Sequence, residues 1–190
     1  MLNLCLLSFP LGALLGTLGD FFHVLAGADG YANPLLPLPT GQPIWVPFLF
    51  GGATFSITLS HLLTHSLLPR KIPQRHWSFY LAGIAFFLAL YAASGFLPLE
   101  TGGMKDVVLW ASCLAFWFLA DRSWQGLATG ISIALVGTSV EIFLTQIGAF
   151  FYYPSFNNLR GVPSWLPSLY VTASIAVGNF AHFLRARLRA

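Results

Sequence analysis

The chain has 190 residues, of which 56% are hydrophobic and only 8% are charged, and its formal net charge is +3. A soluble domain must cover its core with polar faces, and so few charged residues cannot supply them. The composition therefore excludes a soluble globular protein and predicts a protein that is embedded in a membrane.

Six long apolar runs follow one another along the chain, most of them near the ~20 residues that a helix needs to cross hydrocarbon. Their apolar residues are continuous and do not alternate with polar ones as in barrel strands, so each run must satisfy its backbone as a helix. The sequence predicts an all-α polytopic membrane protein, a bundle of six transmembrane helices in a single domain over residues 1–190. The expected spans are 2–26, 45–68, 79–97, 105–120, 127–151 and 166–184.

The basic residues are divided unequally between the two sides of this bundle. Only Lys105 and Arg160 lie on one side. The other side holds the connections after the second and fourth spans and the end of the chain, with Arg70, Lys71, Arg75, Arg122, Arg185, Arg187 and Arg189. Because short loops rich in Lys and Arg stay in the cytosol, both termini are predicted to be cytosolic.

Small residues recur at helical spacing in several of the expected spans. Gly12 and Gly16 in the first span, and Gly126 and Gly130 in the fifth, are four residues apart. This spacing is typical of helices that pack closely. A second interpretation stays open, in which the missing side chains leave room for a lipid-sized ligand against the backbone.

The ionisable side chains within the expected spans that we single out are Asp20, His23, His61, His65 and Glu141. Such groups cost free energy in hydrocarbon unless they are paired or hydrated, so each is a candidate functional residue. Asp20 and His23 are close enough in sequence to share a helix face, as are His61 and His65. We expect an intramembrane polar cluster in which Glu141 or Asp20 meets His23 or His61 and lines a cavity for a ligand headgroup.

The histidine pair also leaves a metal-dependent membrane enzyme open, in which His61 and His65 join a carboxylate. Leu62 stands where a His-Glu-x-x-His metalloprotease has its catalytic Glu, and the sequence contains no Gly-x-Ser-x-Gly elbow or glycine-rich phosphate loop. We therefore expect no enzyme, with no catalytic residue and no metal, and keep the metal enzyme as the alternative. A small transporter is a second alternative, although paired broken helices are lacking.

Several short motifs in the chain resemble those of one known family. They are Trp-Val-Pro at 45–47, Gly-Gly-Ala-Thr at 51–54, Trp-Phe-Leu-Ala-Asp-Arg-Ser at 117–123, the glycine at 126, Ser-Trp-Leu-Pro at 164–167 and Gly-Asn at 178–179. Together they resemble the Insig (insulin-induced gene) family of six-span membrane proteins. The resemblance covers most of the chain from about residue 45 onward and is strongest from residue 110 to the end.

The resemblance implies a lipid sensor rather than an enzyme. Eukaryotic members bind oxysterols within the bundle and retain the sterol-sensing protein Scap in the endoplasmic reticulum, which implies roles in sterol sensing and sterol homeostasis. Bacterial relatives hold a diacylglycerol-like lipid as a homotrimer. This chain lacks the polar terminal extensions of the animal proteins and looks like the prokaryotic type. The implied cofactor is only a bound lipid, and the implied location is the plasma membrane, or the endoplasmic reticulum with a Scap-like partner in a eukaryotic host; no nucleic acid is expected.

The resemblance also implies ligand-binding residues. Phe87 and Trp117 fall where family members line the sterol pocket with aromatic rings. Met104 aligns with a pocket Gln and Val108 with a pocket Thr. These departures remove hydrogen-bonding groups that could position a ligand hydroxyl, so a less polar, more lipid-like ligand fits better than an oxysterol.

Two acidic residues receive expectations from the same resemblance. Asp121 aligns with an Asp that family members need for Scap engagement; on physical grounds alone it caps the next helix or pairs with Arg122. Glu141 replaces a neutral polar residue of the animal proteins, and we expect it to contact the ligand headgroup. Asp20 and His23 have no obvious counterpart in the animal proteins.

Overall fold

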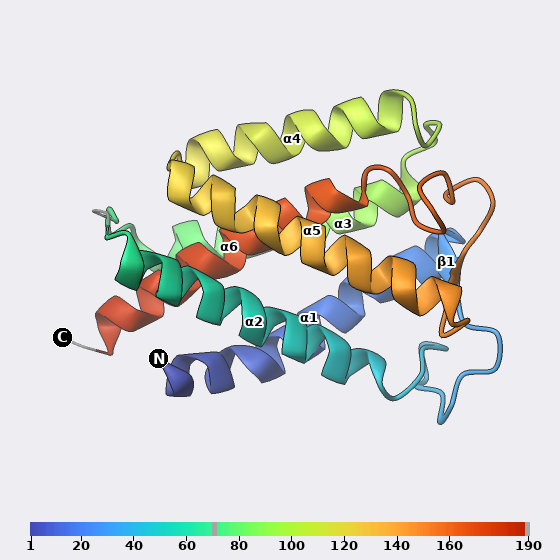
Figure 1. Ribbon diagram of the computed structural model, residues 1–190, viewed down its shortest axis with the longest axis horizontal. Coiled ribbons are helices and arrows are strands. Elements are labelled where there is room, and N and C mark those ends of the chain that lie inside the picture. The colour runs from blue at the N-terminus through green and yellow to red at the C-terminus, as the bar shows by residue number, and fades with distance from the viewer. Residues whose placement is uncertain (70–71, 189–190) are drawn as a thin grey trace.

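The computed structural model describes residues 1–69 and 72–188, so Arg70, Lys71 and Arg189, on which part of the predicted orientation rests, lie outside the described residues. Over the described residues the chain forms six helices and two short strands. They are α1 (Leu2–Ala26), β1 (Asp29–Gly30), α2 (Val46–Leu67), α3 (Trp77–Phe96), α4 (Met104–Ala120), α5 (Trp124–Gln146), β2 (Phe151–Tyr152) and α6 (Leu166–Arg187). Figure 1 shows the helices running along the long axis of the molecule.

Local sequence explains where several helices begin and end. α2 and α6 both start with a Trp followed by a Pro in the first turn, where the missing amide hydrogen is tolerated. α1 ends at Ala26 and is followed by Gly27, whose positive φ of 65° forms a left-handed C-cap. α5 begins at Ser123, whose hydroxyl accepts a hydrogen bond from the Gly126 amide at 3.0 Å.

α6 is the central helix of the bundle, because it contacts each of the other five helices. Most of its residues are buried, including the polar side chains of Thr172, Ser174 and His182. Its small residues let neighbouring helices approach closely. At Gly178 an added Cβ would lie 2.4 Å from the His61 ring of α2, so only glycine leaves space for that side chain.

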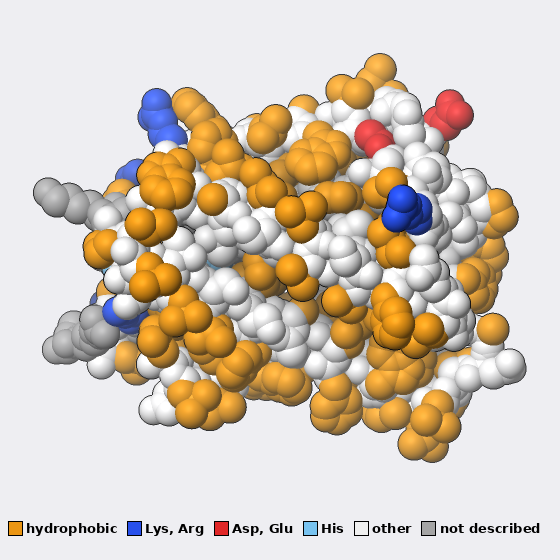
Figure 2. Space-filling view, in the orientation of Figure 1, with side chains coloured by type: hydrophobic (Ala, Val, Ile, Leu, Met, Phe, Trp, Pro, Cys, Tyr) orange, Lys and Arg blue, Asp and Glu red, His pale blue; other side chains and the backbone are white. Residues whose placement is uncertain are grey.

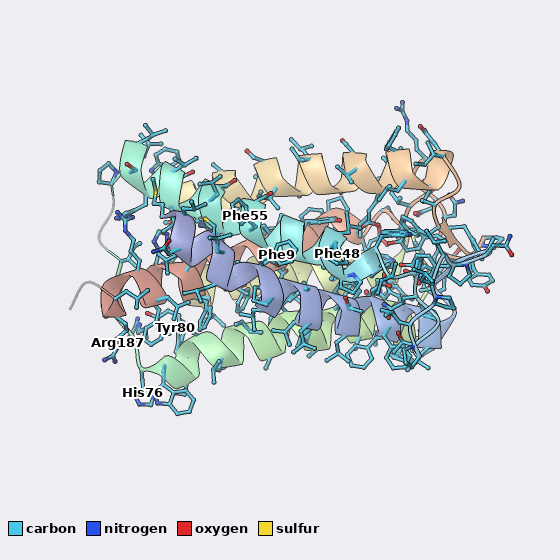
Figure 3. All side chains as sticks on the ribbon, turned by 90° about the horizontal axis from the view of Figure 1, so that it is seen from below. Phe9, Phe48, Phe55, His76, Tyr80 and Arg187 are labelled. Carbon is cyan, nitrogen blue, oxygen red and sulfur yellow. The ribbon has the colours of Figure 1, made fainter. Side chains whose placement is uncertain are left out.

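α1 and α2 form the closest pair of neighbouring helices, and small residues lie at their contact. Phe9 of α1 packs against Gly51 of α2, where a Cβ would come within 2.8 Å of the ring (Figure 3). Conversely, Phe50 and Thr54 of α2 pack against Gly16 and Gly12 of α1. The small-residue spacing of the first span therefore lets α1 and α2 pack closely. Gly12 and Gly16 also line a cavity beside α1, so the second interpretation stays open.

The composition of the helices is that of a membrane protein. α1, α2, α3 and α5 are each long and apolar enough to cross a membrane. In Figure 2 hydrophobic side chains cover the flank of the bundle, whereas the visible charged side chains lie near its two ends. The chain is therefore a multi-pass membrane protein. α4 is shorter, with 17 residues, and α6 carries polar side chains that face the interior.

α5 differs most from its expected range. The fifth apolar run was expected to stay helical to residue 151, but α5 ends at Gln146 and Gly148 takes a positive φ of 73°. The run remains apolar beyond the helix because Phe150 and Tyr152 are core residues. Hydropathy reports burial here, and the glycine decides where the helix stops.

The two ends of the bundle are built differently. At one end, which we call the capped end, the connections 27–45 and 147–165 cover the helices, and β1 pairs with β2 in an antiparallel register of Asp29 with Tyr152. At the other end, the terminal end, α1 begins and α6 finishes (Figure 1). Cys5 and Cys113 are both buried free thiols.

Candidate functional site

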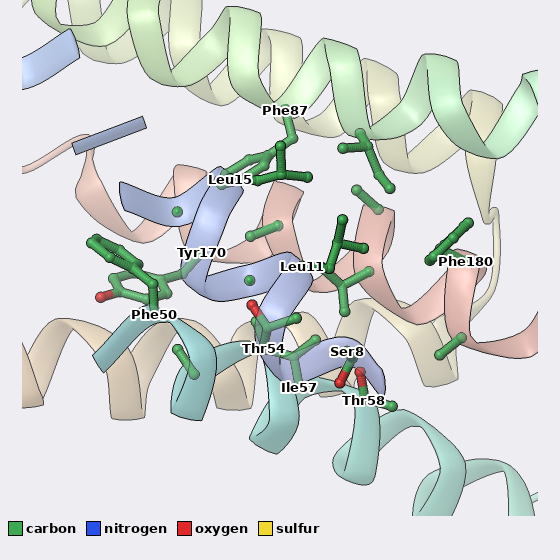
Figure 4. A pocket seen from close by; sticks show the side chains of 18 of the residues that line it. Ser8, Leu11, Leu15, Phe50, Thr54, Ile57, Thr58, Phe87, Tyr170 and Phe180 are labelled. Carbon is green, nitrogen blue, oxygen red and sulfur yellow. The ribbon is translucent and has the colours of Figure 1, made fainter. Parts of the chain in front are cut away.

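A cavity lies between α1, α2, α3 and α6, with a volume of about 80 Å³ (Figure 4). Its walls are mainly aliphatic and aromatic, with Leu11 and Leu15 from α1, Phe50 from α2, Phe87 from α3 and Phe180 from α6. Walls of this kind suit an apolar guest. The space is smaller than the ~300 Å³ of a typical small-ligand pocket, so a whole lipid would enter only as the wall side chains or helices moved apart.

Glu141 of α5 reaches the cavity at its capped end. One carboxylate oxygen accepts a hydrogen bond from the Tyr152 hydroxyl at 2.7 Å, and the other accepts one from the Tyr170 hydroxyl at 2.6 Å. Burial, followed by the negative charge of Glu141, raises the pKa of Tyr152, so its phenol stays protonated and remains a donor. The carboxyl group is thus held in place by one tyrosine from β2 and one from α6.

Asp20 of α1 ties the first connection of the capped end to the bundle. Its Oδ2 atom accepts hydrogen bonds from the Tyr31 hydroxyl at 2.9 Å and from the Gln42 amide at 2.6 Å. The same amide group donates to the backbone oxygen of Thr17 at 2.9 Å. A buried carboxylate is stable when such donors surround it, so Asp20 has a structural role in anchoring the cap.

His23, one turn further along α1, is fully buried and bonds to a different set of residues. Its Nε2 atom lies 2.7 Å from the Ser94 hydroxyl, which itself donates to the Tyr91 backbone oxygen at 2.7 Å. From this hydrogen-bond pattern we assign the proton of the neutral imidazole to Nε2. The Nδ1 atom then faces the Asp29 carboxyl at 3.6 Å. Burial, and then the charge of Glu141, raises the pKa of Asp29 well above its ordinary value.

The arrangement in which Ser94 contacts His23 and His23 faces Asp29 is also that of a serine-hydrolase triad. Ser94 is 0% exposed, however, and its hydroxyl proton is used by the Tyr91 backbone. Neither Ser94 nor His23 lines the cavity. A nucleophile needs space for a carbonyl group and for the oxyanion beside it, so these three residues are assigned a structural role.

Lys105 completes the buried polar groups of the capped end, and sequence reasoning did not single it out as a site residue. Its side chain is only 2% exposed, its ammonium group donates to the Ser94 backbone oxygen at 3.1 Å and it lies 4.5 Å from the centre of the Phe156 ring. A cation at the C-terminal end of α3 is stabilised by the helix dipole, and the aromatic face adds further attraction.

The histidines of α2 lie elsewhere. His61 bonds through Nε2 to the Ser174 hydroxyl at 2.9 Å, and its ring lies 6.1 Å from that of His182. His65 also packs on His182, with ring centres 5.1 Å apart. The expected cluster is therefore split: Asp20 and His23 contribute to the capped end, whereas His61 contacts α6 towards the terminal end. Within residues 1–69 and 72–188, no group of three or more His, Cys, Asp or Glu side chains is placed to hold a metal ion.

Of the expected ligand-binding residues, Phe87 and Glu141 line the cavity and the three on α4 do not. Met104 is 61% exposed, Val108 is half-buried, and Trp117 packs on the core beside α6 while its indole N–H donates to the Ser123 oxygen at 3.0 Å. The physical reason is the position of α4, because the cavity is bordered by α1, α2, α3 and α6.

Asp121 organises the turn between α4 and α5. Its carboxylate accepts hydrogen bonds from the amide of Ser123 at 3.1 Å and from the hydroxyl of the same residue. An added Cβ at Gly126 would lie 2.1 Å from that carboxylate, which explains the glycine. Arg122 has a positive φ of 55° and stacks 4.4 Å above the Phe118 ring. Ser123 is itself the N-cap of α5, so Asp121 positions the capping residue and does not cap the helix as expected on physical grounds.

No family model matches the chain. It is 31% identical to the INSIG protein homolog of Mycolicibacterium vanbaalenii over 180 residues, which are 94% of this chain and 85% of that protein. It is 28% identical to the insulin-induced gene 1 protein of Gallus gallus, with 93% of this chain and 69% of the relative covered.

Solved structures give a similar result. The fold matches the crystal structure of a mycobacterial Insig homolog, MvINS from Mycobacterium vanbaalenii, with a TM-score of 0.88, 27% identity, and coverage of 98% of this chain and 96% of the other. A cross-linked MvINS trimer matches with a TM-score of 0.86, 28% identity and 97% coverage of both chains.

Proposed function

Given that the chain belongs to the Insig family, we propose that it binds a lipid in the cavity between α1, α2, α3 and α6 and acts by associating with partner proteins, without catalysis. The ligand is a diacylglycerol-like lipid or a sterol. The observation that carries this proposal is the chemistry of the cavity, which has mainly apolar walls and a single carboxyl group, that of Glu141, at its capped end.

An amphipathic lipid matches both parts of this cavity. Its hydrocarbon gains from contact with walls such as Phe87 and Phe180. Both oxygens of Glu141 already accept a phenol, yet a carboxylate oxygen can accept more than one hydrogen bond. A lipid hydroxyl at the capped end would therefore find an acceptor whose position is fixed by Tyr152 and Tyr170.

The proposal includes six membrane spans with both termini in the cytosol. α4 and α6 would cross beside the four strongly apolar helices, because the polar residues of α6 face the interior rather than lipid. Arg75, Arg122, Arg185 and Arg187 belong to the connections and helix end on the side of the termini. The membrane is the plasma membrane in a prokaryotic host or the endoplasmic reticulum in a eukaryotic one.

The proposed partners follow from the family. A trimer of the mycobacterial relative supports a homotrimer of this chain. In a eukaryotic host the partner would be a Scap-like sterol-sensing protein. The sterol-sensing role itself also belongs to this proposal, as does the absence of catalysis.

The test is mass spectrometry of the purified protein in mild detergent under conditions that retain bound molecules. The expected result is a neutral lipid bound at about one per chain. A protein that carries no lipid and binds none of the added diacylglycerol or sterol would contradict the proposal. Stoichiometric zinc or iron would also contradict it and would favour the metal enzyme.

A further inference from the structure

One wall of the cavity carries hydroxyl groups. Ser8 of α1 and Thr54 and Thr58 of α2 line it, and Figure 4 shows their side chains between these two helices. The facing wall is apolar on the terminal-end side of the capped-end tyrosines. It is formed by Ile84, Phe87, Ala173, Val177 and Phe180. The cavity therefore has polar atoms at a second place, away from Glu141.

Thr58 and Thr138 are the two helical threonines among the described residues whose buried hydroxyls have no hydrogen-bond partner, and of these only Thr58 lines the cavity. Threonine inside a helix commonly donates to the backbone oxygen one turn earlier. Three others in this chain do so, Thr17 to Ala13 at 2.6 Å, Thr129 to Gln125 at 2.8 Å and Thr172 to Ser168 at 2.8 Å. Thr58 is 1% exposed, and its hydroxyl has no hydrogen-bond partner in the part of the chain that the structure describes. A buried hydroxyl without a partner costs free energy that a guest could recover.

Ser8 supplies the complementary group. Its hydroxyl donates to the Cys5 backbone oxygen at 2.8 Å, so its oxygen can still accept a hydrogen bond. Thr58 is free to donate, and the two residues together therefore offer one donor and one acceptor. The hydroxyl group of a lipid alcohol can use both, because it accepts one hydrogen bond and donates another. An anionic group is disfavoured because none of the described residues that line the cavity is Lys or Arg.

We propose that Thr58 and Ser8 form a second polar subsite, which binds a hydroxyl group carried on the hydrocarbon part of the lipid. This inference rests on the proposed lipid-binding function and adds a preference for hydroxylated lipids. Thr58 lies 12 residues from the start of α2 and Glu141 lies 5 residues from the end of α5, both counted from the capped end. At 1.5 Å per residue the two polar places are separated by about 10 Å along the bundle.

The experiment uses the full-length protein, cleared of bound lipid, and a series of monoacylglycerols of equal chain length. One member has an unmodified chain, and the others carry a single hydroxyl group at successive carbons. The wild type is expected to bind one of these positional isomers about tenfold more tightly than the unmodified lipid, the value of one well-made hydrogen bond. Thr58→Val is expected to lose this preference and to keep the wild-type affinity for the unmodified lipid.

Thr172→Val is the matched control, because Thr172 is equally buried but its hydroxyl is used by its own helix. It should keep the preference. In lipid-free protein the two substitutions should shift the melting temperature in opposite directions: upward for Thr58→Val, which removes an unpartnered hydroxyl, and downward for Thr172→Val, which removes a hydrogen bond.

Three results would overturn the inference. Equal binding of all members by the wild type, or an unchanged preference in Thr58→Val, would eliminate the second subsite and leave lipid binding itself intact. A wild-type protein that binds none of the monoacylglycerols, and neither diacylglycerol nor sterol, would overturn the proposed function together with the subsite.

Discussion

The capped end and the terminal end both bury polar side chains, but they use them differently. At the capped end, the carboxyl group of Glu141 is held by two phenols and also borders the cavity. Towards the terminal end, His61, His65 and His182 pack on one another, beside a space of only about 10 Å³. A buried polar group in a membrane helix therefore indicates a ligand site only where it adjoins space for the ligand.

The largest expected effect comes from removing the central acceptor of the capped end. Glu141→Ala leaves the buried hydroxyls of Tyr152 and Tyr170 without their acceptor, which should cost roughly 2–5 kcal/mol of unfolding free energy. It should also abolish lipid binding. Thermal unfolding in detergent and lipid titration measure the two effects.

His61→Ala is the matched change towards the terminal end. It should lower the melting temperature, because the Ser174 hydroxyl loses its partner and a cavity opens beside Gly178. Lipid affinity should stay at the wild-type value. Loss of lipid binding in His61→Ala, with binding retained in Glu141→Ala, would reverse the roles of the two ends.

Packing at Gly178 gives a smaller effect. Gly178→Ala places a methyl group where the His61 ring lies, and overpacking of this kind costs roughly 1–3 kcal/mol. A fall in melting temperature is expected, and His61→Ala should relieve it in the double variant because the clashing ring is gone. If the changes in melting temperature of the two single variants simply added in the double variant, α2 and α6 would not be in close contact at this position.

The next effect depends on pH and belongs to the capped end. The folded pKa of Asp29 is raised, so the folded protein binds a proton that the unfolded chain has released. Stability therefore falls as pH rises from the unfolded value, about 3.9, through the raised folded pKa. Its steepest slope is roughly 1.4 kcal/mol per pH unit. Asp29→Asn should remove this part of the pH dependence. The test compares the unfolding free energy of the wild type with that of Asp29→Asn over the same pH range. If the wild type gained stability relative to the variant as pH rises, the carboxyl group of Asp29 would not be buried and neutral.

The smallest effect is expected on α4. Met104→Gln and Val108→Thr restore the polar residues that the family resemblance places in the pocket. Because α4 does not border the cavity, lipid affinity should change by less than twofold. A large gain in sterol affinity for either variant would show that the ligand lies against α4.

Much of the fold could be predicted from the sequence, because apolar runs of this length must form helices in a membrane. The helical periodicity correctly indicated that Asp20 and His23 belong together on one face of α1. Periodicity could not show which helices pack against that face. The prediction therefore grouped His61 with Asp20 and His23 of the capped end, whereas His61 lies towards the terminal end. Glu141 was found because a carboxylate within an apolar run is rare and costly.

The partners of these residues were harder to foresee. Tyr152 and Gln42 lie in the connections of the capped end, where no periodic pattern relates them to Glu141 or Asp20. The only available signal was a general one: an intramembrane carboxylate needs a polar or phenolic residue beside it. The family resemblance correctly indicated Phe87 as a cavity residue but did not reveal that Trp117 lies outside the cavity wall.

The most direct test of the lipid site is photo-crosslinking of the membrane-embedded protein with a diazirine-bearing diacylglycerol, followed by peptide mapping. The account predicts labels on residues of α1, α2, α3 and α6 that line the cavity, lost in Ala173→Phe, which fills it, and retained in Ala111→Phe on the exposed face of α4. Labels confined to the outer faces of the helices, unchanged by Ala173→Phe, would contradict it.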